Sequence, residues 1–177
     1  MRRLTLLAAA ALAAVCILLP ASACKRHRQR AAAEQPSGPA SLLSMADPRA
    51  AVQLTRGFYD PEQGSWRWTA KEFSAVLNPP STAKEKGAIL VFRFSVPEAS
   101  IQQLKSLTLS AKVDGTAVDP ETYTQAGDCV YRRELPPSAF HGGVTTVDFL
   151  LDKALPPAGS DLRELGVVAQ SVGLEAK

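Results

Sequence analysis

Alternation of apolar and polar residues is the feature that most constrains how this chain folds. From Ala50 onward, apolar side chains recur at every second position in short runs, which Gly, Pro or Asp residues interrupt about every 8–15 positions. Thirteen prolines also disfavour long helices, because proline breaks the hydrogen bonding of a helix interior. The pattern therefore predicts an all-β domain of short strands and tight turns.

Seven or eight strands are expected between residues 49 and 177. Residues 88–96 alternate most densely, and residues 107–113 carry one apolar and one polar face. Asp114-Gly115 follows directly and predicts a hairpin with a two-residue turn. Short antiparallel strands in this number favour a two-sheet β-sandwich of the jelly-roll type, with a barrel as the alternative. The other expected strands cover residues 52–58, 66–77 (with a bulge), 130–135, 144–151 and 165–174.

Residues 1–23 have the pattern of a secretory signal peptide. Arg2 and Arg3 precede an apolar run over residues 4–19, and Ala21 and Ala23 fit the small-residue cleavage positions. This run of 16 residues is shorter than the ~20 that a membrane-spanning helix needs. The sequence therefore predicts export, with an uncleaved membrane anchor as an alternative that the basic residues at positions 25–30 favour.

Cys24 comes directly after the predicted cleavage site. It resembles the cysteine of the lipobox in bacterial lipoproteins, although Ala21 stands where leucine is usual. That resemblance implies acylation of Cys24 and attachment to a membrane of the cell envelope. Lys25 in the next position differs from the aspartate associated with inner-membrane retention, which favours the outer membrane. Plain secretion is the other alternative.

Residues 24–48 are predicted to form a flexible linker, because Pro, Gly and Ser are frequent and few residues could build a core. The charge is uneven along the chain. Through Arg49 there are seven Lys/Arg against two Asp/Glu, and from Ala50 onward thirteen against fifteen. The net charge of +3 therefore belongs to the leader and linker. Since a nucleic-acid-binding domain carries its positive charge on the folded part, we expect no nucleic-acid partner.

Catalytic and metal-binding motifs are scarce. His141 is the one histidine of the predicted domain and Cys129 its one cysteine, and no phosphate-binding glycine loop is present. We expect no metal and no cofactor. Two local pairs of carboxylates could serve glycoside hydrolysis, although an enzyme is the least favoured hypothesis. These pairs are Asp60 with Glu62, and Asp161 with Glu164.

Trp66-Arg67-Trp68 is the most informative triplet. Strand alternation places both tryptophans on one face and Arg67 on the other. One interpretation is an aromatic platform that stacks against sugar rings, with Arg67 or Glu62 making polar contacts. The alternative places both indole rings in the sandwich core.

Asp161 and Arg163 form a second candidate site before the last expected strand. Their charges could contact a ligand, or they could clasp a loop against the sheet. For the clasp, which we favour, Glu62 is a candidate partner if the first and last strands are neighbours.

Two segments together resemble a carbohydrate-binding-like β-sandwich domain that accompanies glycosyltransferases in bacterial polysaccharide proteins. The first runs from Gly57-Phe58-Tyr59 to Trp66-Arg67-Trp68-Thr69, and the second is the Asp-x-Arg-x-Leu-Gly pattern of residues 161–166. The resemblance implies a jelly-roll fold and an ancillary role with glycans. No glycosyltransferase accompanies this domain in the sequence.

The sequence thus favours a non-catalytic, lipid-anchored envelope protein whose β-sandwich binds glycan. Trp66, Arg67 and Glu62 are the first candidate contacts, and Asp161 and Arg163 the second. The alternative is a structural or assembly lipoprotein that binds another envelope protein, for example by strand addition at a sheet edge.

Overall fold

The computed structural model describes residues 39–177. The predicted signal peptide, Cys24 and the greater part of the predicted linker lie outside the described residues. Between residues 39 and 177, no helix has the length and hydropathy needed to cross a membrane.

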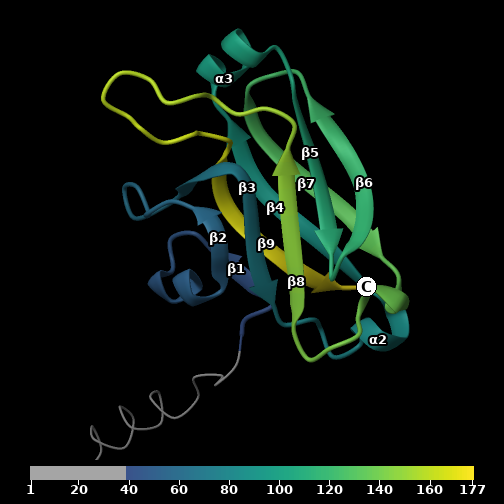
Figure 1. Ribbon diagram of the computed structural model, residues 1–177. Coiled ribbons are helices and arrows are strands. Elements are labelled where there is room, and N and C mark those ends of the chain that lie inside the picture. Colours follow the sequence, from purple (N-terminus) through teal and green to yellow (C-terminus); the bar gives the residue numbers. More distant parts are fainter. Residues whose placement is uncertain (1–38) are drawn as a thin grey trace, which may run out of the picture. The chain divides into compact units, whose positions relative to one another are not determined.

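Nine antiparallel strands build the described part of the chain (Figure 1). They are β1 (Leu42–Ser44), β2 (Leu54–Phe58), β3 (Arg67–Leu77), β4 (Ala88–Val96), β5 (Leu107–Val113), β6 (Thr116–Tyr123), β7 (Gly127–Leu135), β8 (Thr145–Leu151) and β9 (Val168–Ala176). Short helices connect some of them: the 3-10 turns Pro48–Val52 and Pro137–Ala139, α2 (Ala83–Lys86) and α3 (Glu98–Leu104).

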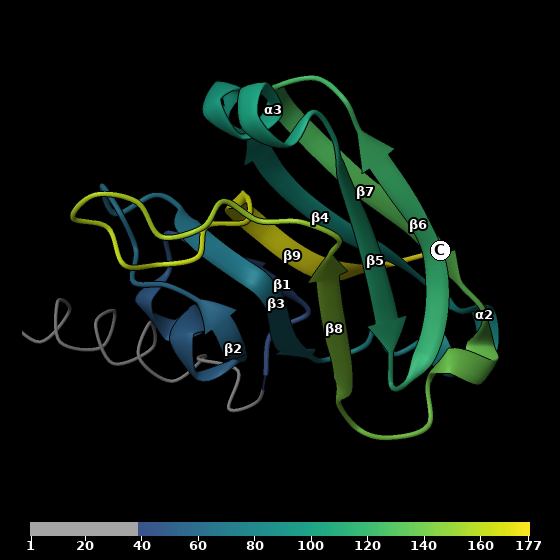
Figure 2. The same ribbon diagram turned by 45° about the horizontal axis from the view of Figure 1, so that its top comes forward.

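Strand β3 joins two packed layers. Its first two residues pair with β9, whereas Glu72–Leu77 pair with β8. One layer, here called the β4 sheet, contains β1, β9, β4, β7 and the start of β3. The other, the β8 sheet, contains β2, the rest of β3, β8, β5 and β6. Figures 1 and 2 show β8 and β5 lying in front of β9 and β4.

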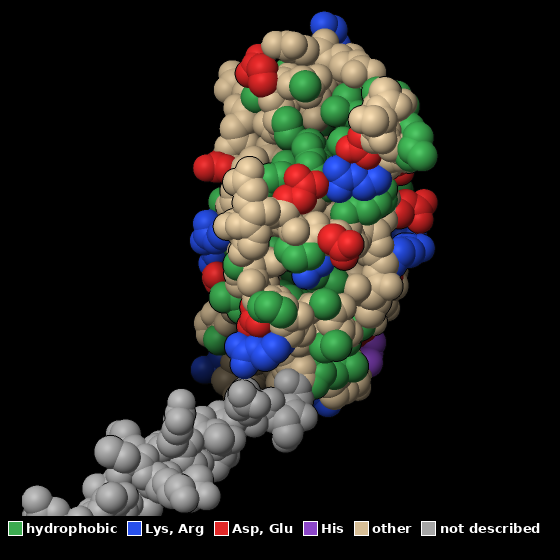
Figure 3. All heavy atoms as spheres, turned by 90° about the vertical axis from the view of Figure 1, so that its left-hand side faces the viewer, with side chains coloured by type: hydrophobic (Ala, Val, Ile, Leu, Met, Phe, Trp, Pro, Cys, Tyr) green, Lys and Arg blue, Asp and Glu red, His purple; other side chains and the backbone are tan. Residues whose placement is uncertain are grey.

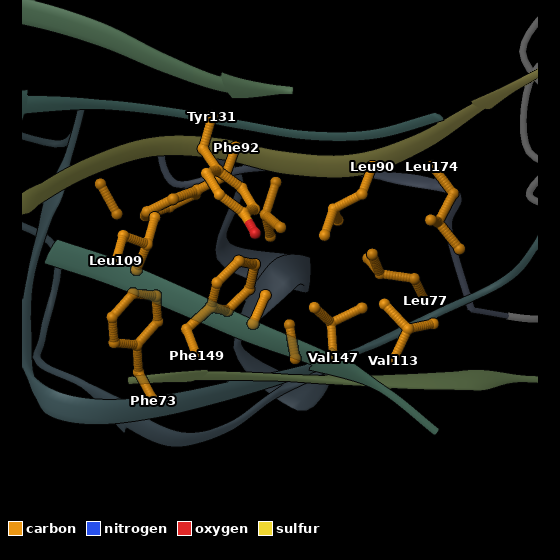
Figure 4. Close-up of a cluster of buried hydrophobic side chains, with 14 of the residues drawn as sticks. Phe73, Leu77, Leu90, Phe92, Leu109, Val113, Tyr131, Val147, Phe149 and Leu174 are labelled. Atoms are coloured by element: carbon orange, nitrogen blue, oxygen red, sulfur yellow. The ribbon is translucent and has the colours of Figure 1, made fainter. Parts of the chain in front are cut away.

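The core lies between these two layers and is rich in phenylalanine. Phe73 of β3 stacks on Phe149 of β8 with ring centroids 4.9 Å apart, and Phe92 of β4 reaches both rings at 5.4 and 5.0 Å. Figure 4 shows side chains of the two layers pointing toward one another, with Tyr131, Phe92 and Leu90 on one side. Large aromatic rings in such offset contacts bind the two sheets firmly.

Side chains close the gap between β6 and β7, the two strands at the ends of the strand order. Tyr131 Oη donates to the Asp119 carbonyl at 2.6 Å, and Arg133 Nε donates to the same oxygen at 2.8 Å. Arg133 also pairs with Glu121 at 2.8 Å. The unpaired backbone groups of an exposed edge strand can pair with another chain, and these side-chain contacts cover the edges of both β6 and β7.

The expected fold class is confirmed. The structure is an antiparallel β-sandwich, and the expected strands correspond closely to β2–β9. Asp114 and Gly115 both have positive φ, 46° and 84°, as a type I′ hairpin turn requires. The pairing of β2 with β3 shifts register twice, once before and once after Arg56. Gly57, the next residue, has a positive φ of 71°.

One boundary needs correction. We predicted a linker up to residue 48, but Leu42–Ser44 form strand β1 and pair with β9, Leu42 opposite Gly173. Leu43 and Met45 are buried, so these apolar side chains anchor the segment to the core. Gly173 allows the close approach, because a Cβ there would lie 2.7 Å from Leu42 Cδ1.

Candidate functional site

Arg67 is a buried structural residue, which corrects our prediction that it contacts a ligand. The sheet register places Arg67 opposite Ala169, whose side chain is fully buried, so both point inward. Only 6% of Arg67 is exposed, and its Nη1 donates to the Tyr59 carbonyl at 3.0 Å. Its guanidinium holds the segment before β3 in place instead of facing solvent.

Trp66 and Trp68 point to the outer face of the β4 sheet. Trp68 pairs with Val168 at the start of β9, and both side chains are partly exposed. The two indole rings meet edge to face, with centroids 6.4 Å apart and an interplanar angle of 81°. Neither ring belongs to the core cluster, so the interpretation of both tryptophans as core residues is wrong.

A row of side chains continues from Trp68 across the same face. Val168 pairs with Ser95 of β4, and Ser95 pairs with Asp128 of β7. Directly opposed residues of antiparallel strands project to the same side, so these four side chains share one surface, here called the outer row. It runs from an aromatic end on β3 to a polar end on β7.

Hydrogen bonds hold the polar end of the outer row in place. Gln170 Nε2 donates to Ser95 Oγ at 2.8 Å and to Asp128 Oδ1 at 3.0 Å, and Ser95 Oγ donates to the same carboxylate oxygen. Hydrogen bonds from Ser95 and Gln170 lower the pKa of Asp128. Asp128 is therefore a fixed, ionised acceptor at neutral pH.

Glu62, Asp161 and Arg163 form the clasp that we favoured. Arg163 grips Asp161 with two nitrogens, Nε at 2.9 Å and Nη2 at 2.8 Å, and its Nη1 reaches Glu62 Oε1 at 2.9 Å. The guanidinium also lies over the Tyr59 ring at 5.2 Å. Hydrogen bonds from Arg163 lower the pKa of Asp161 to about 2.

Further contacts attach the same loop, residues 152–167, to the tryptophan segment. Tyr59 Oη donates to the Glu164 carbonyl at 2.9 Å, and Glu164 Oε2 accepts the Lys71 backbone N–H at 3.1 Å. Gly166 N donates to the Thr69 carbonyl at 2.7 Å. Three of the four carboxylates in the two proposed pairs therefore make structural contacts: Glu62, Asp161 and Glu164 each hold the loop. The fourth, Asp60, is exposed in the turn before Glu62.

The outer face of the β8 sheet contains a groove that sequence reasoning missed. Its volume is about 800 Å³, and its lining comes from β2, β3, β5, β6 and β8. Arg56 lies 3.5 Å from Glu72 and 3.7 Å from Asp148, and Ser74 Oγ donates to Asp148 at 2.5 Å. Among the described residues that line it, Phe149 is the one aromatic residue, and it is buried. The groove therefore offers paired charges and hydroxyls without an exposed ring.

Cys129 and His141, the one cysteine and the one histidine of the described residues, do not lie in a common site. Cys129 is partly buried and packs against the core, and His141 is exposed after the second 3-10 turn. Across residues 39–177, no three His, Cys, Asp or Glu side chains lie close enough together to hold a metal ion. Figure 3 shows one face of the described part, on which basic, acidic and apolar side chains are interspersed.

Comparison with known proteins gives likenesses of structure. No protein-family model and no curated protein sequence matches the chain. The CBM36-1 domain of a multidomain xylanase, from the hindgut metagenome of Trinervitermes trinervoides, is 9% identical over 75% of this chain and 94% of that chain, with a TM-score of 0.39. A family 35 carbohydrate binding module from an environmental isolate is 13% identical over 81% and 90%, with a TM-score of 0.36.

An enzyme is also similar in structure. The exo-beta-1,3-galactanase of Phanerochaete chrysosporium is 8% identical, with a TM-score of 0.40; the match covers 77% of this chain and 29% of the galactanase chain. Carbohydrate-binding modules are thus among the solved structures to which this chain is similar.

Proposed function

We propose that this chain is a non-catalytic glycan-binding module of the bacterial cell envelope, held at a membrane by lipid on Cys24. The observation that carries the glycan-binding part is the display of Trp66 and Trp68 on an outer sheet face, outside the core. Indole rings stack on the apolar faces of sugars, and exposed aromatic rings favour ligands with both apolar and polar faces.

The position of the clasp supports this proposal. Arg163, Glu62 and Asp161 tie the loop of residues 152–167 to the turn before Trp66. A binding surface gains affinity when its contacts are held in place before the ligand arrives, because less conformational entropy is lost on binding. Glu62, Asp161 and Arg163 thus act as positioning residues beside the tryptophans.

A non-catalytic role agrees with how the carboxylates are used. Glycoside hydrolysis needs one free general acid and a second free carboxylate across the scissile bond. Here Glu62 and Asp161 bind the same guanidinium, and Glu164 accepts a backbone N–H. These contacts favour binding over turnover.

Binding to a panel of envelope and extracellular polysaccharides tests the glycan-binding part. The full chain, purified in detergent, is compared with Trp68→Ala, and Val52→Ala serves as the control for an exposed apolar side chain, which is 86% exposed at Val52. We expect selective retention that Trp68→Ala loses and Val52→Ala keeps, with circular dichroism showing that both variants fold. Retention lost instead in Arg56→Ala would move the site to the groove of the β8 sheet.

The anchor is tested separately. In cells, the Cys24→Ser variant should no longer be found in the membrane fraction, and it should no longer incorporate labelled fatty acid. A chain that stays in the membrane without its acyl group would contradict lipidation and support the uncleaved anchor. If no polysaccharide is retained while a defined membrane protein co-purifies, the alternative of an assembly lipoprotein replaces glycan binding.

A further inference from the structure

We infer that the outer row is one continuous site for a neutral oligosaccharide, which stacks on Trp68 and ends in hydrogen bonds to Gln170 and Asp128. This inference rests on the proposed function and adds the extent of the site and the class of its ligand. The clasp of Glu62, Asp161 and Arg163 is separate from this site, because none of the three residues belongs to the outer row.

The length of the outer row sets the size of the ligand. Trp68 lies on β3 and Asp128 on β7, and β9 and β4 lie between them. With neighbouring strands about 4.8 Å apart, the row spans about 14 Å. A single sugar ring does not reach from the indole to the carboxylate, so use of both ends requires an oligosaccharide.

The middle of the row suits the apolar side of a sugar chain. Val168 is partly exposed between Trp68 and Ser95, so it continues the apolar surface of the indole for one further strand. Beyond it the surface becomes polar at Ser95. An aromatic end followed by an aliphatic and then a polar segment matches a chain of rings whose faces are apolar and whose edges carry hydroxyls.

The polar end offers acceptors that are already oriented. Both hydrogen bonds to Asp128 within the described residues go to Oδ1, which leaves Oδ2 for a hydroxyl of the ligand. The Gln170 amide uses its nitrogen toward Ser95 and Asp128, so its carbonyl oxygen points elsewhere and can accept a second hydroxyl. Sugar hydroxyls are donors, and an ionised acceptor forms a strong hydrogen bond with them.

The charge at this end disfavours an acidic glycan. The Asp128 carboxylate would face the carboxylate of a uronic acid, and like charges at close range repel. Arg93 is exposed on the same face, opposite Val130, and no ion pair joins it to Asp128 in the part of the chain that the structure describes. The carboxylate is therefore held by neutral donors, and its charge remains available to select against acidic rings.

A ladder of oligosaccharides tests the inference. Calorimetry with the full chain uses fragments of one to six units, cut from each neutral polysaccharide that the panel retains, and oligogalacturonates of equal length. We expect affinity to rise up to about three units and then level, with oligogalacturonates binding at least tenfold more weakly. Asp128→Asn should bind the three-unit fragment with about tenfold lower affinity and the one-unit fragment with unchanged affinity. It should also discriminate less against oligogalacturonates. Glu134→Gln, an exposed carboxylate on the same strand, is the matched control and should change nothing.

The outcomes separate this inference from the function on which it rests. If Trp68→Ala abolishes binding while Asp128→Asn and Gln170→Ala leave the whole ladder unchanged, glycan binding stands and the outer row is not one site. If the wild-type affinity does not depend on length, the inference also fails. If the wild-type chain binds no glycan of the panel, the proposed function falls and the inference with it.

Discussion

Arg163 Nη1 lies 2.9 Å from Glu62 Oε1, although 101 residues separate the two along the chain. This contact joins the loop between β8 and β9 to the turn that precedes β3. Because Arg163 also holds Asp161 with two nitrogens, one side chain sets the position of the loop next to the tryptophans.

Removal of Arg163 should loosen the loop more than it destabilises the fold. In Arg163→Ala, we expect faster chymotrypsin cleavage within residues 152–167 and a small fall in Tm, because partly exposed ion pairs contribute little to global stability. Arg163→Lys should not restore protection, since an ammonium cannot bind Asp161 in bidentate fashion and reach Glu62 as well. Arg132→Ala removes another exposed arginine, paired with Glu175 within the sheet, and should leave loop cleavage unchanged. Equal cleavage of all variants would contradict the clasp.

The contribution of Asp161 to stability should depend on pH. Hydrogen bonds from Arg163 lower the pKa of Asp161 to about 2, so the folded state favours the ionised form. This stabilisation is complete above the unfolded-state pKa of about 3.9 and is lost as the pH falls toward the folded-state value. Asp161→Asn should therefore have a lower Tm than the wild type at pH 6, and the difference should shrink toward pH 2. A difference that stays constant over this range, measured by circular dichroism, would show that the carboxylate charge is not involved.

Phe92 should be among the most sensitive positions of the core. Its ring contacts Phe73 and Phe149 of the opposite layer and Phe94 of its own strand, and it is fully buried. Phe92→Ala should cost about 3–5 kcal/mol in the free energy of unfolding, because it removes apolar contacts and leaves a cavity. Leu150→Ala, at a side chain that is 44% exposed on β8, should change it by less than about 0.5 kcal/mol. Urea unfolding measures both, and similar values would be incompatible with the core described above.

Gly166 should not accept a side chain, although its backbone φ is not in the left-handed region. A Cβ at this position would lie 2.6 Å from Thr69 Oγ1 and 2.7 Å from the Ala70 carbonyl oxygen. Gly166→Ala must therefore shift the loop away from β3, with a loss of about 1–3 kcal/mol typical of overpacking. At Gly143 a Cβ meets nothing within 4 Å, so Gly143→Ala is the control and should be close to neutral. Thermal unfolding of the two variants side by side decides the matter.

Cys129 should react slowly with alkylating reagents. Burial, and then the charges of Asp128 and Glu121, raise the pKa of its thiol. The thiolate is the reactive form, so little of it is present at pH 7.5. Iodoacetamide labelling of the folded chain should be much slower than that of the chain in urea. The unfolded thiol should become reactive near its ordinary pKa of about 8.5, whereas the folded thiol should need a higher pH. Equal rates in both states would indicate that the thiol is not protected as described.

The strands were predictable because their cause is local. Alternation of apolar and polar residues assigns each side chain to a face, and Phe92 and Phe149 lie inside as their positions in residues 88–96 and 144–151 indicate. The Asp114-Gly115 turn was also predictable, because both positions need positive φ and these two residues tolerate it. The short helix α3 carries no comparable signal, and it escaped prediction.

Strand β1 shows where local pattern fails. Leu42–Ser44 contain only three residues, too few for a period to be recognised, and they follow a stretch rich in Pro and Ser. Their partner is β9, about 130 positions further along the chain, where Gly173 leaves room for Leu42. Pairing at that separation depends on the whole sandwich being assembled.

The candidate site divides in the same way. The sequence by itself determined the alternation that sends Trp66 and Trp68 to one face and Arg67 to the other, because strand geometry requires it. Only the tertiary structure decided which face is the interior, and it buried Arg67 and displayed the tryptophans. Only the strand order β3-β9-β4-β7 placed Ser95, Gln170 and Asp128 beside them. Alternation is a property of neighbouring residues, whereas strand order follows from burying both sheets against each other, and that choice involves the entire domain.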